Sequence, residues 1–206
     1  MWNAYMVKAA EFVIGSDIPV CPCTAEIISK QLISFADAKH LHKLNIKTDP
    51  NYHIDAFAHF YIDDQKFDGP KSSIWFHPSG TLELLRHFNG IITAGFSTNA
   101  DFPDPIKRYN TYHMRVLGFW LASNGIPVIN NVHWGTEETW DYCFDGIPYN
   151  STAAIGTAAS GIRKLENRPD FELGLFKMVE VLDPKTIIVY GSANYDCFRV
   201  LADNGI

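Results

Sequence analysis

Apolar runs alternate with amphipathic stretches along the last two-thirds of the chain, and this alternation predicts repeated βα units. Short runs rich in Val, Ile and Ala are typical of strands buried on both faces, and apolar residues every three or four positions are typical of helices. The predicted strands are Ile91–Ala94, Val128–Val132, Ala153–Thr157 and Ile187–Tyr190. The predicted helices are Ser79–His87, Pro105–Asn124, Glu137–Phe144, Pro169–Leu182 and Tyr195–Asp203.

The first 70 residues follow no such rhythm. The aromatic residues of Asp55–Asp63 favour a strand, Ser73–Phe76 is a further candidate strand, and Thr24–Lys43 has the periodicity of a helix. A chain of 206 residues is long enough to bury a core. We therefore expect one α/β domain over residues 1–206, with residues 1–70 as its less regular N-terminal portion.

The succession of strand and helix predicts an α/β fold with a mainly parallel sheet, because parallel strands need a crossover between them. We expect this sheet to curl into a small or incomplete TIM-barrel-like fold. The chain is near the lower length limit for a complete eight-stranded barrel. An open, doubly wound sheet is the alternative, and no internal repeat decides between the two.

Composition and charge limit the kinds of partner that this protein is expected to bind. The formal net charge of -6 argues against nonspecific binding to nucleic acid, because there is no basic surplus to neutralise phosphates. No apolar run reaches the roughly 18 residues of a membrane span, and no signal peptide is visible. The four cysteines form no disulfide framework, and Cys143 and Cys197 lie in apolar contexts typical of core thiols. We therefore expect a cytoplasmic protein with a small polar ligand and no membrane partner.

Two groups of residues contain potential metal ligands, but neither has the pattern of a metal site. Cys21 and Cys23 are separated by a single residue, whereas zinc sites usually have two to four residues between paired cysteines. His53, Asp55 and His59 would share one face of a strand, but such groups are more often ordinary surface residues. We predict no metal site, and the sequence identifies no cofactor.

Polar side chains follow the predicted strands, and the carboxyl ends of parallel strands are where α/β proteins bind ligands. Asp101 and Glu138 are the candidate general bases. Arg115 could clamp an anionic group, or it could pair structurally with Asp104 or Glu138. Trp134 could stack on a ring or close the core, and Asp101 could cap a helix instead. The candidate ligand-binding residues are Ser97, Asn110, Arg115, Asn131, His133, Trp134, Ser160 and Tyr190.

Well-known catalytic signatures are absent from the sequence. There is no Gly-rich phosphate loop, no G-x-S-x-G nucleophile elbow and no HExxH zinc helix. The small residues of Gly156–Gly161 could hold an anion through main-chain N–H groups.

Five segments together resemble the domain-of-unknown-function family numbered 4417, whose members occur in bacteria, phages and mobile elements. They read NTYHMR, GFWLASNGIPVINNVHWG, YCFDGI, AIGT and IIVYG, and with the residues between them they cover about Phe88–Gly191. The resemblance implies no assigned activity. It also implies that relatives tend to carry an aspartate at Gly95, an arginine at His133, and a Gly-Cys pair near Ala159-Ser160. Without a carboxylate at Gly95, this chain would either bind without catalysing or use Asp101.

Three functions remain open. The first is an enzyme, a hydrolase or transferase, that acts on a nucleotide- or sugar-derived metabolite at the strand ends. The second is a noncatalytic binder that sequesters a nucleotide signal of host defence. The third is a protein-interaction module, suggested by the aromatic residues between Phe57 and Phe76.

Overall fold

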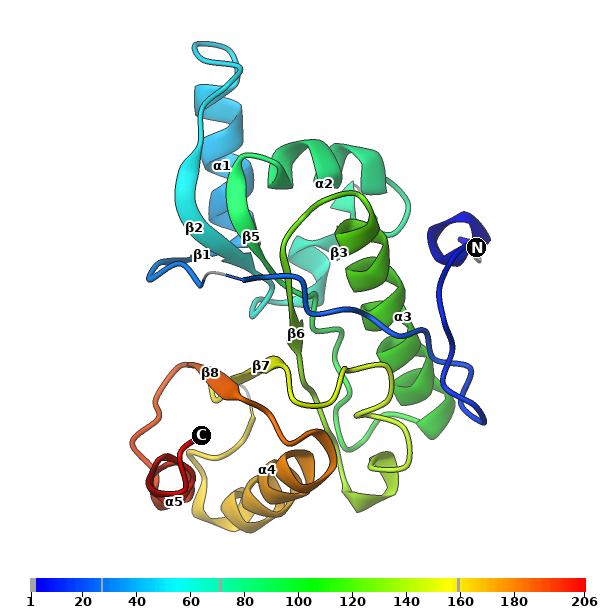
Figure 1. Cartoon of the computed structure of the whole chain (residues 1–206), viewed down its shortest axis with the longest axis vertical. Helices are drawn as coiled ribbons and strands as arrows, with labels where there is room; N and C mark the ends of the chain where they lie inside the picture. Colours follow the sequence, from blue (N-terminus) through cyan, green and yellow to red (C-terminus); the bar gives the residue numbers. More distant parts are fainter. Residues whose placement is uncertain (1–2, 27, 71, 159) are drawn as a thin grey trace.

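Six strands run parallel in one sheet, and their order in the sheet follows their order in the chain (Figure 1). The structure is a computed structural model that describes residues 3–26, 28–70, 72–158 and 160–206. The strands, in sheet order, are β1 (Leu32–Ser34), β2 (Ile54–His59), β5 (Phe88–Ile92), β6 (Val128–Asn131), β7 (Thr152–Gly156) and β8 (Thr186–Tyr190). The four strands predicted from Val, Ile and Ala runs are confirmed, and each pairs parallel with its neighbours.

An α-helix lies in each connection between successive strands of the sheet except that from β6 to β7, and a further helix follows the last strand. The helices are α1 (Phe35–Asn45), α2 (Pro78–Leu85), α3 (Asp104–Ser123), α4 (Arg168–Leu182) and α5 (Asp196–Asp203). Single 3-10 turns are η1 (Ala4–Val7), η2 (Asp64–Lys66), η3 (Glu137–Thr139) and η4 (Leu165–Asn167), and a small antiparallel hairpin is formed by β3 (Asp68–Gly69) and β4 (Ser72–Ser73). Helix α3 ends where the sequence predicts, because Gly125 adopts a φ of 84° that side chains rarely tolerate.

The strand order selects the barrel-like alternative. A doubly wound sheet reverses its strand order at a switch point and carries helices on both faces. Here the order never reverses, so right-handed crossovers place all helices on one face. The fold is therefore a curled half-barrel, and the open doubly wound alternative is wrong.

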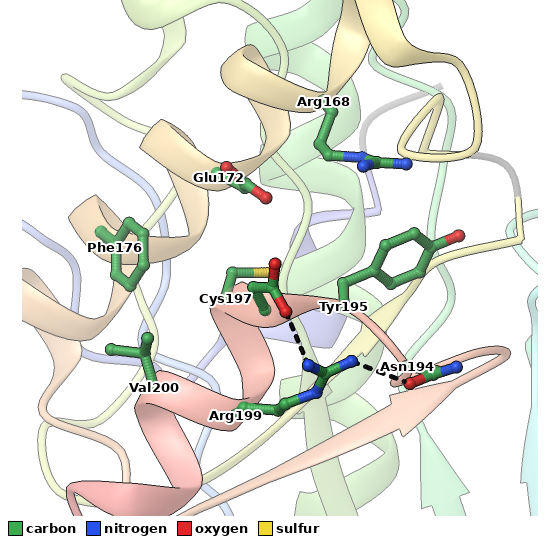
Figure 2. A pocket seen from close by; sticks show the side chains of 9 residues that line it. Arg168, Glu172, Phe176, Asn194, Tyr195, Cys197, Arg199 and Val200 are labelled. Carbon is green, nitrogen blue, oxygen red and sulfur yellow. Dashed lines mark hydrogen bonds and ion pairs between the residues drawn. The ribbon is translucent and has the colours of Figure 1, made fainter.

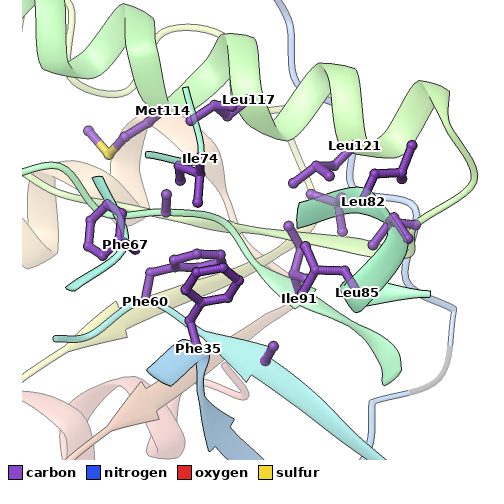
Figure 3. Packing of buried hydrophobic residues seen from close by; sticks show 14 of the residues in the cluster. Phe35, Phe60, Phe67, Ile74, Leu82, Leu85, Ile91, Met114, Leu117 and Leu121 are labelled. Atoms are coloured by element: carbon purple, nitrogen blue, oxygen red, sulfur yellow. The ribbon is translucent and has the colours of Figure 1, made fainter. Parts of the chain in front are cut away.

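The core between the sheet and its helices lies on the outer face of the half-barrel. In its first half, Phe60 and Ile91 of the sheet side pack with Leu117 of α3 (Figure 3). In its second half, Ile155 of β7 packs with Leu175 of α4 and Phe198 of α5. Cys143 and Cys197 are buried in this second half, as predicted, and all four cysteines are free thiols.

The inner face has its own apolar cluster, made by Phe57, Ile92, Ile129 and Ala154. These residues come from four adjacent strands and are completely buried. No helical residue belongs to the cluster within the described part of the chain. The inner face is therefore filled by the strands themselves, as in the interior of a barrel.

An irregular N-terminal segment takes the space beside β6 where a βα barrel would carry a helix. The Cys21 N–H donates to the carbonyl of Gly146 (2.8 Å), and the Asn130 side chain donates to the carbonyl of Cys21 (2.9 Å). Helix α3 passes close to this segment because Gly118 lacks a side chain; a Cβ there would lie 2.5 Å from the Cys21 sulfur. The less regular portion is thus packed into the outer layer.

Two helix predictions are wrong. Residues 24–43 do not form one helix, because Leu32–Ser34 joins the sheet and Ser34 caps α1 by accepting the Asp37 N–H (3.1 Å). Residues 137–144 form only η3 followed by turns. Tyr142, Cys143 and Phe144 are all buried in succession, so this stretch lacks the polar face that the helix prediction assumed. The candidate strand Ser73–Phe76 contributes only its first residue to β4, outside the main sheet.

Candidate functional site

Polar and aromatic side chains lie on the inner face at the carboxyl ends of the strands. Side chains on one face of a strand recur every second residue. Two residues beyond the buried Phe57 and Ile129 and the partly buried Ile188, the chain therefore presents His59, Asn131 and Tyr190. We call five residues of this region the concave polar cluster: His59, Tyr61, Asn131, His133 and Tyr190.

The curl of the sheet brings the two ends of this cluster together. Strands β2 and β8 are separated by three strands, so in a flat sheet they would lie about 19 Å apart at 4.8 Å per strand. The rings of His59 and Tyr190 nevertheless have centroids only 4.3 Å apart. The half-barrel is therefore nearly closed at this point.

Tyr61 lies across the cluster. Its ring stacks on Tyr190 with centroids 4.7 Å apart and planes 7° from parallel. Its hydroxyl donates to the side-chain oxygen of Asn131 (3.0 Å). Gly156 makes room for the ring, because a Cβ there would lie 2.8 Å from Tyr61 Cδ1.

His59 is buried, with 3% of its surface exposed, and burial lowers its pKa from 6.5 to about 4. The ring is therefore neutral at physiological pH. Its Nδ1 accepts the main-chain N–H of Tyr61 (3.2 Å), so the proton of the neutral ring is on Nε2. No described residue accepts a hydrogen bond from Nε2, and this donor is available to a ligand.

His133 and Asn131 form the β6 side of the cluster. Burial, and secondarily the positive charge of Arg115, lower the pKa of His133 to about 4, so this ring is also neutral. His133 has no hydrogen bond to any described residue, and neither has the side-chain amide nitrogen of Asn131. Both groups lie against Gly95, where a Cβ would clash with the Asn131 amide and lie 3.2 Å from His133 Nε2.

Arg115 is not part of the cluster. Its side chain is completely buried on the outer face, between α3 and the segment after η3. It donates to three main-chain carbonyls, those of Asp145 (3.0 Å), Cys143 (3.1 Å) and Asn131 (3.3 Å). This location favours a structural role for Arg115 over a ligand clamp. Its partners are main-chain carbonyls and not the Asp104 or Glu138 carboxylates considered from the sequence, and Asp104 pairs with Arg108.

Three further predicted ligand residues make local structural contacts. The Ser97 N–H and hydroxyl both donate to Asp64, and the Asn110 amide donates to the Ser97 carbonyl (2.6 Å). Burial raises the pKa of Asp64, an effect that the Ser97 hydrogen bonds oppose. The Ser160 hydroxyl donates to the Thr157 carbonyl (3.2 Å). The neighbouring Ala159 lies outside the described residues.

Trp134 and the two predicted general bases also lie apart from the cluster. The indole of Trp134 packs against Gly174 and Phe171 of α4, on the outer face. Asp101 is exposed in the turn before α3, and Glu138 is exposed in η3. Of the ten predicted site residues, the structure therefore gathers Asn131, His133 and Tyr190.

His59 and Tyr61 are the cluster members that the sequence did not single out as ligand-binding residues. The available signal was the alternation along β2, which places His59 on the face of Phe57. The sequence instead grouped His59 with His53 and Asp55. No group of three or more metal-binding side chains occurs in the part of the chain that the structure describes.

A separate groove of about 590 Å³ lies on the outer layer between α4 and α5 (Figure 2). Arg199 crosses its floor, paired with Asp196 (2.8 Å) and Asn194 (3.3 Å), while Phe176 and Val200 form an apolar side. None of the cluster residues lines this groove. The groove is therefore distinct from the carboxyl ends of the strands.

The fold and the cluster place this chain among parallel α/β half-barrel proteins with polar groups at the carboxyl ends of their strands. The family model described as "Domain of unknown function (DUF4417)" matches residues 10–202, and the chain belongs to this family. The resemblance inferred from the sequence is confirmed.

Two phage proteins are similar to this chain. The "Gene 1 protein" of Mycobacterium phage L5 is 32% identical over 138 residues, which are 66% of this chain and 58% of the phage protein. The "Gene 1 protein" of Mycobacterium phage D29 is also 32% identical over 138 residues, or 66% of this chain and 49% of the phage protein. The matched region is thus about half the length of these relatives. No solved structure matches the chain.

Proposed function

We propose that this protein binds a small polar metabolite, derived from a nucleotide or a sugar, at the concave polar cluster and acts on it as a hydrolase or transferase. The observation that carries this proposal is the pair of neutral histidines with unused ring nitrogens, His59 and His133. Buried polar groups normally have hydrogen-bond partners, so groups left free at strand ends are suited to a ligand.

The two histidines suit different roles. His59 can donate its Nε2 proton to a carbonyl or phosphoryl oxygen, because a neutral imidazole with a fixed tautomer is a hydrogen-bond donor at that atom. His133 can accept or relay a proton beside it. The Arg115 charge beneath Asn131 favours a ligand oxygen that gains negative charge.

The experiment compares the wild-type protein with His59→Ala. Adenosine 5′-monophosphate and ribose 5-phosphate are the probes, with binding measured by native mass spectrometry and turnover by product analysis. We expect binding and turnover of one probe by the wild type, with turnover at least tenfold lower in His59→Ala. His40→Ala is the matched control, because His40 is an exposed histidine of α1. Equal turnover in both variants would overturn the assignment of His59.

A noncatalytic binder of a nucleotide signal is the second candidate. Its support is the position of Asp101 and Glu138, which leaves the cluster without a carboxylate, together with the phage relatives. Retention of a probe with no product would favour this reading.

The interaction-module hypothesis loses its original support. Phe57, Phe60, Phe67 and Trp75 are buried core residues, and of the large aromatics between Phe57 and Phe76 only the last is more than half exposed, at 57%.

A further inference from the structure

The Tyr61 ring fills a flat slot on the inner face of the half-barrel. One face of the ring lies on Tyr190, and Gly156 lies against its edge without a side chain. At the end of the slot, Asn131 holds the hydroxyl. The slot is therefore one aromatic ring thick and carries a hydrogen-bonding group at its far end.

We propose that this slot is the binding site for a planar nitrogen heterocycle, such as the adenine base of a nucleotide, and that Tyr61 occupies it until the ligand enters. This inference rests on the proposed function, because it names the ligand class of the same site. The ligand would replace Tyr61 both on the face of Tyr190 and at the amide of Asn131.

The amide of Asn131 determines which heterocycles fit. Its oxygen accepts the Tyr61 hydroxyl, while its nitrogen has no partner among the described residues, although the residue is only 1% exposed. Once Tyr61 leaves, the amide offers an acceptor and a donor side by side. Adenine presents the complementary pair, the N6 amino donor and the N7 acceptor, which asparagine binds through two hydrogen bonds.

The main chain of Asn131 is fixed, which orients this amide. Its N–H donates to the Thr93 hydroxyl (2.8 Å), and its carbonyl accepts from Arg115 (3.3 Å). The side chain is therefore presented from a rigid strand end, and recognition needs no rearrangement of β6.

The composition of the slot favours a base over a sugar or a free phosphate. His59 and His133 of the cluster are neutral, and the departure of Tyr61 would leave the ring face of Tyr190 as a stacking surface. Aromatic stacking on a nucleobase contributes to binding without requiring charge. A phosphate would instead be expected beside a lysine or arginine side chain.

Tyr61 is placed where it can leave without breaking the sheet. It lies two residues beyond the end of β2, is partly exposed, and makes no strand pairing. Rotation of its side chain would release the stack on Tyr190 and one hydrogen bond while leaving the main chain in place.

The test is calorimetric titration of adenosine into wild type, Tyr61→Ala and Tyr61→Phe. We expect Tyr61→Ala to bind adenosine at least tenfold more tightly than wild type, equivalent to about 1.4 kcal/mol, because the slot is already empty. Tyr61→Phe loses only the bond to Asn131 and should gain about two- to fivefold. Tyr149→Ala is the control at an exposed tyrosine and should behave as wild type.

Equal or weaker binding of adenosine by Tyr61→Ala, or no binding to any variant, would overturn the slot. Thermal melts of each variant separate a lost fold from a lost site. Ribose 5-phosphate should gain nothing from Tyr61→Ala. If its turnover depends on His59 while adenosine shows no gain, the proposed function stands and the base-binding slot is wrong.

Discussion

Replacing Arg115 by alanine should strongly lower the stability of this protein. The guanidinium is completely buried and donates hydrogen bonds to three main-chain carbonyls. No other described side chain donates a hydrogen bond to these carbonyls. Hydrogen bonds to charged groups contribute about 1.5–3 kcal/mol each. The alanine variant no longer carries the desolvation cost of burying the guanidinium charge, and this offsets part of the lost hydrogen-bond energy. We expect a net loss of about 3–5 kcal/mol in the free energy of unfolding.

This loss is a large share of the roughly 5–15 kcal/mol by which a domain is stable. Urea denaturation followed by circular dichroism measures it, with an unchanged slope and a lower midpoint. At about 2–4 °C per kcal/mol for a chain of this size, the melting temperature should fall by roughly 6–20 °C. Arg115→Lys should fall between wild type and alanine, because an ammonium lacks the planar fork that serves separated carbonyls.

Arg108→Ala is the matched control on the same helix. Arg108 is half exposed and pairs with Asp104 (2.7 Å) across one turn of α3, so its loss should change stability by less than about 1 kcal/mol. If Arg115→Ala is as stable as Arg108→Ala, the structural role is refuted, and a loss of ligand binding at full stability would restore the clamp predicted from the sequence.

Three further changes test the packing and the histidines. Gly118→Ala should lower the free energy of unfolding, measured by urea denaturation, by about 1–3 kcal/mol, because its Cβ would press on Cys21. Gly80→Ala in α2, where a Cβ would meet open space, should be neutral or stabilising, and equal effects of the two changes would contradict the close approach of α3 to Cys21. Ile129→Asp should prevent folding, since it places an unpaired charge in a completely buried position, and a normal melt would refute the buried strand. His59 has a pKa of about 4 in the folded protein against 6.5 in the unfolded chain, so its contribution to stability is complete above pH 6.5 and is lost as the pH falls to 4. Between pH 7.5 and 5 the free energy of unfolding should therefore fall by about 2 kcal/mol less in His59→Gln than in wild type. Identical pH dependences of the two free energies would refute the burial of His59 in its neutral form.

Strong local signals explain why most elements of the second two-thirds were predictable. The run Thr186–Tyr190 consists mostly of β-branched residues, and α3 is framed by Pro105 and by Gly125. Short parallel strands separated by helices allow few arrangements. The same rules fail for residues 137–144, where the single turn η3 is followed by turns, and the Cys143 and Asp145 carbonyls of these turns accept hydrogen bonds from Arg115.

No helix in the described part of the chain is long and apolar enough to cross a membrane.

The first third was hard to predict from the sequence because its structure depends on distant partners. Residue Cys21 is held by Gly146 and Asn130, more than a hundred positions away, and periodicity carries no record of such contacts. Local propensity is therefore a poor guide wherever an irregular segment takes the place of a helix.

The candidate site shows where reasoning from strand ends reaches its limit. Every strand end of a parallel sheet was treated as equivalent, which found Asn131, His133 and Tyr190 but added exposed residues such as Glu138. What separates the two sets is the direction of the side chain relative to the curl. Only inward positions meet across the half-barrel, and the contact between His59 and Tyr190 requires the sheet to bend through four strand spacings. Counting by twos from the buried belt at Phe57 would have included His59 and Tyr61, because the inner face, rather than the strand end alone, selects the residues that converge.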